Sequence, residues 1–230
     1  MIRVEAITIV LDPARTVSGL LQRPPEAAAL FVMAHGAGAG MTHPFMVSVA
    51  QGLAERGVAT LRYQFPYMEA GRNRPDPPPI LQETVRAAVM KAGEIVPELP
   101  IVAGGKSLGG RMTSSAAATA SLDRARGLVF LGFPLHPPGQ PGIHRADHLQ
   151  AVDVPMLFLQ GTRDGFARLD LITDVTSRLQ SLATLHVVDG ADHSFNVPKR
   201  AGRSQDQVID ELAEAIVSWA RTLGGDSVRA

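Results

Sequence analysis

The pentapeptide GKSLG at residues 105–109 holds a serine between glycines, where a tight turn can expose its hydroxyl. The apolar residues 100–103 before it predict a short buried strand, and the small residues 111–120 after it predict a helix. A G-x-S-x-G pattern between a strand and a helix is typical of a nucleophilic serine, because side chains in place of its glycines would collide with neighbouring backbone. The pattern predicts that Ser107 attacks the carbonyl carbon of a substrate.

A serine hydroxyl needs a base to accept its proton, and the base needs a carboxylate to hold it in the right tautomer. In the chain order typical of such sites, the acid and then the histidine follow the serine, each after a late strand. Asp164 follows one apolar run and His193 follows the next. The competing carboxylates lie in a predicted helix or flank the histidine: Asp170, Asp174, Asp189 and Asp192. Position at a strand end favours Asp164, so we predict a triad of Ser107, His193 and Asp164.

The motif HGAGAG at residues 35–40 follows another apolar run and predicts a glycine-rich loop at the same edge of a sheet. Acyl transfer needs backbone N–H groups that converge on the oxygen that becomes negative, and glycines allow that approach. We therefore assign these donors to the backbone of Ala37 and Leu108, and expect His35 to support the loop. A dinucleotide-binding G-x-G-x-x-G fingerprint would need a glycine where the chain has Met41.

Residues of this loop, and residues that follow two other predicted strands, are candidates for binding the substrate. They are His35, Gly36, Tyr67, Phe133 and Pro134. A phosphate-binding loop is an alternative interpretation of the GKS sequence, but it would need a glycine in place of Pro100. Only His144 and His148 are spaced like metal ligands, and no third ligand is evident. The predicted chemistry requires neither a metal nor an organic cofactor.

Apolar runs that alternate with amphipathic segments predict a mainly parallel sheet with helices on both faces. Ligands of such sheets bind beyond the carboxyl ends of the strands. Residues 3–10 and 17–22 predict an antiparallel pair of edge strands before this alternation. We expect one α/β domain over residues 1–230, without a large cap. The pocket should then be shallow, with the loops at 66–79 and 134–147 able to cover it.

Composition excludes several classes of function. Lys and Arg together number 22, as do Asp and Glu, so the net charge gives no reason to expect a nucleic acid or a membrane surface as partner. The absence of cysteine excludes a disulfide framework and a thiolate nucleophile. The chain starts without the pattern of a secretory signal, and no apolar run approaches the roughly 18 residues of a membrane-spanning helix. A cytoplasmic location and a small-molecule partner are expected.

Seven segments in this order resemble the small bacterial α/β-hydrolases of the dienelactone-hydrolase-like superfamily: HGAGAGM, RYQFPYMEAGR, PDPPP, GGKSLGGRM, GFPLHPPG, LQGTRD and GADHSF. More narrowly, the chain is similar to the group of testis-expressed hydrolase-like proteins and the hydrolase-like domain of NSL complex subunit three. The resemblance implies an α/β-hydrolase fold and the triad of Ser107, Asp164 and His193. Dienelactone hydrolases themselves use a cysteine nucleophile, so the serine departs from their pattern.

The residues and the resemblance together predict a serine hydrolase that cleaves a small carboxylic ester or thioester through an acyl-serine intermediate. The superfamily also includes enzymes that act on lactones and peptides, so the resemblance does not identify the substrate. An alternative is a hydrolase-like interaction module that keeps the fold without turnover. Labelling of Ser107 by a probe that requires an activated serine discriminates between the two.

Overall fold

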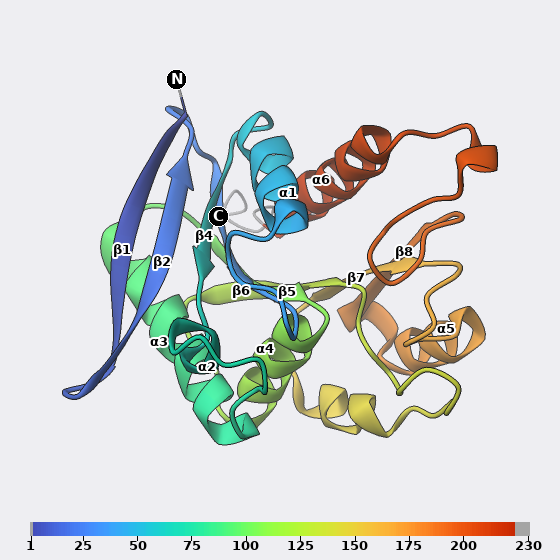
Figure 1. Ribbon diagram of the computed structural model, residues 1–230, viewed down its shortest axis with the longest axis horizontal. Helices are drawn as coiled ribbons and strands as arrows, with labels where there is room; N and C mark the ends of the chain where they lie inside the picture. Colours follow the sequence, from blue (N-terminus) through green and yellow to red (C-terminus); the bar gives the residue numbers. More distant parts are fainter. Residues whose placement is uncertain (1, 224–230) are drawn as a thin grey trace, which may run out of the picture.

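Eight strands form one sheet in the order β1-β2-β4-β3-β5-β6-β7-β8. The computed structural model describes residues 2–223 (Figure 1). Strands β3 to β8 run parallel, whereas β1 and β2 are antiparallel and β1 forms one edge. The strands are β1 (Arg3–Asp12), β2 (Arg15–Arg23), β3 (Ala29–Ala34), β4 (Val58–Tyr63), β5 (Ile101–Lys106), β6 (Ala125–Leu131), β7 (Met156–Gly161) and β8 (Ala183–Val188). The predicted mainly parallel sheet with an antiparallel N-terminal pair is confirmed.

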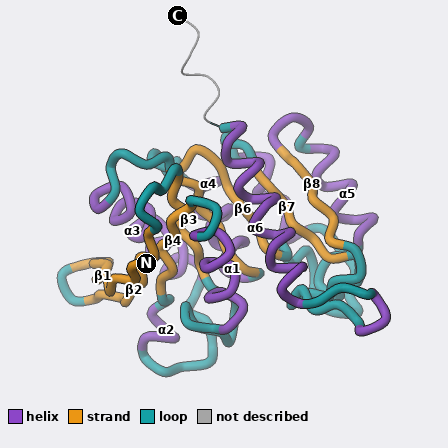
Figure 2. The backbone as a smooth tube through the Cα atoms, turned by 90° about the horizontal axis from the view of Figure 1, so that it is seen from above, coloured by secondary structure: helices purple, strands orange, loops and turns teal. Residues whose placement is uncertain are grey.

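Helices cover both faces of the sheet. In Figure 1, α1 and α6 lie above it, while α3, α4 and α5 lie below. Figure 2 shows the β1–β2 hairpin extending from one end of the sheet. The helices are α1 (Pro44–Ala54), α2 (Pro66–Glu69), α3 (Pro78–Ile95), α4 (Leu108–Thr119), α5 (Leu169–Arg178) and α6 (Gln205–Thr222), with short 3₁₀ turns at His144–Ala151, Gln180–Leu182 and Lys199–Ala201.

The continuous apolar run of β3 is explained by burial on both faces. Successive side chains of a strand point to opposite faces. Leu30 and Val32 enter the core beneath α3 and α4, and Phe31 and Met33 enter the core beneath α1 and α6. A strand between two helix layers therefore has no polar face, which is why the sequence reads as apolar without alternation.

Some elements differ from the sequence-based prediction. Strand β5 extends to Lys106, because Gly104 and Gly105 continue the strand rather than forming a turn. The proline-rich loop after β4 contains the short helix α2, which begins at Pro66, a residue whose fixed φ suits the first helical position. The terminal helix, which the amphipathic pattern of residues 207–223 predicts, begins at Gln205 as α6, because a capping box formed by Ser204 and Gln207 ends the preceding loop.

The parallel topology places the carboxyl ends of β3 to β8 at one edge of the sheet. The loops that leave these ends carry the glycine-rich segment, the serine, Asp164 and His193. The candidate functional residues therefore belong to one rim built from several separate crossovers.

Among residues 2–223, no helix is both long enough and apolar enough to cross a bilayer.

Candidate active site

Ser107 forms the whole turn between β5 and α4, with φ +50° and ψ −113°. A non-glycine residue at positive φ is strained, and such strain persists only where the surrounding structure enforces it. Here the enforcement is tight packing on β3. A Cβ at Gly105 would lie 2.1 Å from the carbonyl oxygen of Ala34, and one at Gly109 would lie 2.6 Å from that oxygen. The predicted need for glycine on both sides of the serine is confirmed.

This packing predicts a large cost for a single methyl group. We expect Gly105→Ala to lower the free energy of unfolding by about 3 kcal/mol, because strand β5 must move away from β3. Gly139→Ala is the matched control, since Gly139 also has positive φ but nothing lies within 4 Å of the added Cβ. It should lose about 1 kcal/mol for backbone strain alone. Urea denaturation measures both, and equal losses would contradict the packing argument.

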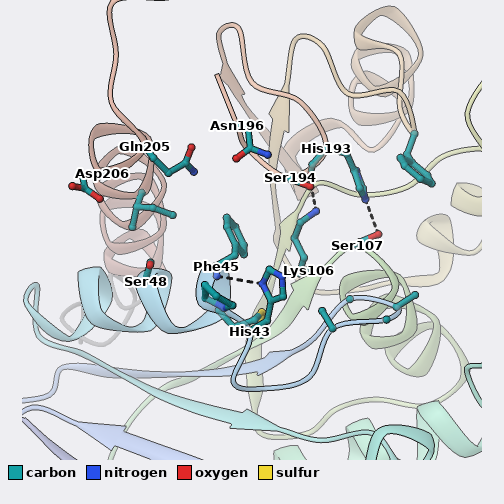
Figure 3. Close-up of a pocket in the computed structure, with 18 residues that line it drawn as sticks. His43, Phe45, Ser48, Lys106, Ser107, His193, Ser194, Asn196, Gln205 and Asp206 are labelled. Carbon is teal, nitrogen blue, oxygen red and sulfur yellow. Dashed lines mark hydrogen bonds between the residues drawn. The ribbon is translucent and has the colours of Figure 1, made fainter. Parts of the chain in front are cut away.

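Ser107, His193 and Asp164 are joined by two hydrogen bonds. His193 Nε2 lies 2.8 Å from Ser107 Oγ, and His193 Nδ1 lies 2.7 Å from Asp164 Oδ2. Figure 3 shows the imidazole directed at the serine hydroxyl. The Nδ1–H group donates a hydrogen bond to the carboxylate, which keeps the proton of the neutral ring on Nδ1. The unprotonated Nε2 then faces the hydroxyl and can accept its proton. This arrangement is able to activate the serine as a nucleophile.

Asp164 is held in place by hydrogen bonds to both of its oxygens. Oδ1 accepts from the Phe166 N–H at 2.7 Å, and Oδ2 accepts from Gln160 Nε2 at 2.5 Å as well as from His193. Three donors therefore fix the orientation of the carboxylate, which is only 5% exposed. The competing Asp192 instead accepts the N–H groups of Ser194 and Asn196, so it shapes the loop that carries the histidine.

The surroundings of His193 favour its neutral form. Burial lowers the pKa of the imidazole, and the nearby positive charge of Lys106 lowers it further, while Asp164 raises it. The Phe166 ring lies against the imidazole, with 4.3 Å between the ring centroids. A neutral imidazole is the form that can accept a proton from Ser107.

The glycine-rich loop after β3 approaches the serine closely. A Cβ at Gly36 would lie 3.8 Å from the Cβ of Ser107. Among residues 2–223, the backbone N–H groups of Ala37 and Leu108 donate no intramolecular hydrogen bond, and Leu108 is the first residue of α4. Amides of this kind, at a loop and at a helix N-terminus, are the donors that a developing oxyanion requires.

His35 supports this loop from below. Its Nε2 accepts the Phe65 N–H at 3.0 Å, and its Nδ1 donates to the carbonyl oxygen of Gly36 at 2.8 Å. Burial lowers the pKa of His35 to about 4, so the ring stays neutral and both nitrogens are used in holding the loop. The expected supporting role of His35 agrees with these contacts.

A cavity of about 680 Å³ opens beside Ser107. Its walls come from the glycine-rich loop, the N-terminal half of α1, the loop after His193 and the start of α6 (Figure 3). The apolar wall consists of Phe45, Met46, Phe166 and Ile209, and the polar groups include Ser48, Asn196, Gln205 and Asp206. The loops at 66–79 and 134–147 contribute none of the lining, so the expectation that they cover the pocket is wrong. Residues of α1 and α6 form part of its wall instead.

Not all of the predicted substrate-binding residues reach this cavity. Gly36 lines it, as do Ala37 and Ser107. The other candidates are buried and do not line it: His35, Tyr67, Phe133 and Pro134. They follow strand ends, as predicted, but Tyr67 and Phe133 belong to the apolar core and His35 is bonded to Gly36 and Phe65. Phe133, for example, packs on Phe130 and Phe158. The prediction that these four contact a substrate is therefore corrected.

No cluster of three or more His, Asp or Glu side chains is placed to hold a metal ion within the part of the chain that the structure describes. His148 Nε2 lies 2.8 Å from Ser114 Oγ. His144 is exposed beside Asp147. The two histidines therefore have separate partners rather than a shared one.

A family model described as an alpha/beta hydrolase domain matches residues 27–221. The chain belongs to the α/β-hydrolase family. The match begins just before β3 and ends within α6, so it spans the parallel sheet, the serine turn and both loops that carry the partners of Ser107. The N-terminal hairpin of this α/β-hydrolase, β1 and β2, precedes the matched residues.

Solved structures show the same fold over nearly the whole chain. A dienelactone hydrolase from Anabaena variabilis aligns with a TM-score of 0.75 and 21% identity, covering 96% of this chain and 98% of that one. Est1E from Butyrivibrio proteoclasticus aligns with a TM-score of 0.72 and 18% identity, covering 96% and 99%. A serine hydrolase without a lid from Xanthomonas campestris aligns with a TM-score of 0.72 and 19% identity, covering 94% and 95%. The likeness shows that these proteins share the fold of this chain.

The sequence prediction missed three residues that contact the histidine or the carboxylate of this α/β-hydrolase. Gln160 bonds to Asp164, Phe166 covers His193, and Lys106 Nζ donates to the carbonyl oxygen of His193 at 2.6 Å. Gln160 had a detectable signal, because a polar residue ends an otherwise apolar strand. Lys106 had none, since its contact joins segments 87 positions apart.

Proposed function

We propose that this α/β-hydrolase is a serine hydrolase that cleaves a small carboxylic ester or thioester through an acyl-serine intermediate. The observation that carries the proposal is the hydrogen-bonded chain from Asp164 through His193 to Ser107, at the wall of a cavity large enough for a small molecule. Cavities of roughly 300 to 1,000 Å³ are typical of small-molecule sites. The strained turn at Ser107 supports the same interpretation.

In the first half of the reaction, Ser107 Oγ attacks the carbonyl carbon while His193 Nε2 takes the hydroxyl proton. The carbonyl oxygen becomes an oxyanion, which the Ala37 and Leu108 N–H groups stabilise. His193 then gives its proton to the leaving oxygen or sulfur, the bond to the carbonyl carbon breaks, and an alcohol or thiol departs. Asp164 stabilises the imidazolium throughout this half.

In the second half, a water molecule attacks the acyl-serine and His193 accepts one of its protons. The same two amides stabilise the second oxyanion. His193 returns the proton to Ser107 Oγ as the ester bond to the serine breaks, and the carboxylic acid leaves. The enzyme is restored, and one water has been consumed for each bond cleaved.

The residues that line the cavity favour a substrate with a partly apolar acyl or alcohol group. Phe45, Met46 and Ile209 form an apolar side on α1 and α6, whereas Ser48 and Gln205 of the same helices supply hydrogen-bonding groups. The volume does not restrict the substrate to the smallest acyl groups. A panel of p-nitrophenyl esters of graded acyl length, assayed with matching acyl thioesters, measures this preference. We expect activity on short and medium chains, and activity on none of them would count against the proposal.

The pH dependence of the reaction provides an independent test. Because burial lowers the pKa of His193 below its usual 6.5, the imidazole stays neutral and active in mildly acid solution. The rate constant kcat/KM should therefore fall only as the pH drops through a midpoint below 6.5. A profile of kcat/KM from pH 4 to 9 on a neutral ester measures the midpoint. An acid midpoint above 6.5 would contradict the assigned environment of the histidine.

The motifs support a narrower placement within the superfamily. We propose that the chain falls in the group of testis-expressed hydrolase-like proteins and the hydrolase-like domain of NSL complex subunit three. The segments GGKSLGGRM and GFPLHPPG carry this proposal, because they are more specific than a G-x-S-x-G pattern. In the structure the first forms the serine turn, and the second begins directly after β6 at Gly132, where a Cβ would lie 3.5 Å from both Asp164 Oδ2 and His193 Nδ1.

A further inference from the structure

We propose that Lys106 is a positioning residue, which ties the loop of His193 to the serine turn and places a positive charge behind the imidazole. The inference rests on the proposed hydrolase function and assigns a role to a residue that this function leaves unused. Lys106 immediately precedes Ser107, so its backbone is fixed by the same strained turn. Its side chain reaches across the site and donates from Nζ to the carbonyl oxygen of His193 at 2.6 Å (Figure 3).

The contact joins two parts of the site that no nearby backbone connects. His193 lies on a long loop between β8 and α6, whereas Ser107 lies between β5 and α4. Strand β5 is separated from β8 by β6 and β7. Lys106 is one residue from the nucleophile along the chain, and its hydrogen bond fixes the backbone of His193 itself. A movement of the loop would therefore have to break this bond before it could separate Nε2 from Ser107 Oγ.

Two aromatic rings help to hold the ammonium group in place. Lys106 Nζ lies 5.5 Å from the centroid of the Phe195 ring and 6.0 Å from that of Phe45. These rings stack on each other, with 5.6 Å between centroids and an interplanar angle of 8°. A cation over aromatic faces regains part of the stabilisation that it loses with its hydration shell. Phe195 also has a positive φ of 62°, so the loop accepts strain where it meets Lys106.

The ammonium lies on the carboxylate side of the imidazole. A Cβ built at Gly132 would be 3.1 Å from Lys106 Nζ, 3.5 Å from Asp164 Oδ2 and 3.5 Å from His193 Nδ1. The three polar groups therefore surround one glycine, which has a positive φ of 71° and leaves them room. On this side of the ring Lys106 does not obstruct Nε2, the nitrogen that must exchange a proton with the serine.

The charges around His193 come from three segments. Asp164 follows β7, Asp192 belongs to the histidine's own loop, and Lys106 ends β5. The two carboxylates raise the pKa of His193, while Lys106 and burial lower it. Burial in turn lowers the pKa of Lys106 to about 8, against the attraction of the same two carboxylates. Below pH 8 the lysine is charged and disfavours the imidazolium, so its removal should raise the pKa of His193.

The test replaces Lys106 with methionine, which keeps the length of the side chain and removes the charge and the donor. Lys91→Met is the matched control, because Lys91 lies in α3, pairs with Glu94 of the same helix and does not line the cavity beside Ser107. We expect Lys106→Met to lower kcat on a neutral ester by about 10- to 100-fold, since small misplacements of a catalytic group have effects of this order. KM should change little, and the acid midpoint of kcat/KM should move to higher pH.

Several results would overturn the inference. One is an unchanged kcat, and another is a lower kcat with an unmoved acid midpoint, which would indicate a purely structural role. A loss confined to the KM of an anionic ester such as p-nitrophenyl hemisuccinate would make Lys106 a substrate-binding residue instead. Should Lys106→Met not fold, Lys106→Arg keeps the charge, and its acid midpoint must then stay near that of the wild type. A wild-type enzyme whose Ser107 neither reacts with a fluorophosphonate nor turns over esters would refute the proposed function itself.

Discussion

Ser107→Ala should abolish both covalent labelling by a fluorophosphonate and hydrolysis of every ester that the wild type cleaves. We expect kcat to fall by about 10⁶-fold, towards the residual rate that oxyanion donors and binding alone provide. The reason is that the substitution removes the hydroxyl that lies 2.8 Å from His193 Nε2. The substitution removes one oxygen and leaves the β5 and α4 backbone unchanged. Labelling followed by mass spectrometry, together with steady-state kinetics, measures the effect.

The matched control is Ser121→Ala, which removes an exposed hydroxyl beyond the end of α4, away from the cavity. It should leave the labelling and the kinetics as in the wild type. Equal labelling of the wild type and Ser107→Ala would show that the probe reacts elsewhere. No labelling of either protein, with both folded, would favour the interaction module over the enzyme.

The meeting of Ser107, His193 and Asp164 at one rim was predictable because parallel topology makes the positions of strand ends predictable. Each predicted residue follows a buried apolar run, and the carboxyl ends of parallel strands meet at one edge of a sheet. Asp164 could be chosen over Asp170 and Asp174 because those two fall in α5, where they pair with arginines. Local patterns were therefore enough to bring Ser107 and His193 to one rim, although 86 positions separate them.

The lining of the cavity was not predictable by the same argument. Tyr67 and Phe133 also follow strand ends. A strand end places a residue at the rim, but it does not determine whether the side chain points into the cavity or into the core. Large aromatic side chains gain most by burial, and both turn into the core. The true apolar wall includes Phe45 from α1 and Ile209 from α6. These helices lie side by side only in the folded chain, so no local pattern pairs them.

Glycines caused the error at the end of β5. A run of glycines beside a serine is typical of a turn, and the strand was predicted to stop before it. In the structure Gly104 and Gly105 are strand residues, because a Cβ at either would lie about 2 Å from backbone oxygens of β6 and β3. They permit close approach of neighbouring strands rather than a reversal of the chain. The turn itself requires only Ser107, which places Lys106 at the strand end, where it can reach His193.

Asp164→Asn should lower kcat by about 10⁴-fold without unfolding the protein, because the amide cannot satisfy the donors that meet at this position. Asp164 accepts three hydrogen bonds, from Phe166, Gln160 and His193. An asparagine whose oxygen faces Phe166 directs its NH₂ group at the NH₂ group of Gln160 and at His193 Nδ1. The imidazole must then carry its proton on Nε2, facing Ser107, and cannot accept the serine proton.

The matched control for this substitution is Asp192→Asn. Oδ1 of Asp192 accepts the N–H groups of both Ser194 and Asn196. An asparagine keeps that oxygen, so the loop should hold its shape and most of the activity should remain. Kinetics on one neutral ester compares the two variants, with circular dichroism to confirm folding. If Asp192→Asn proved as damaging as Asp164→Asn, the carboxylate that orients His193 would have to be reassigned, because a shared loss cannot come from the Asp164 contacts alone.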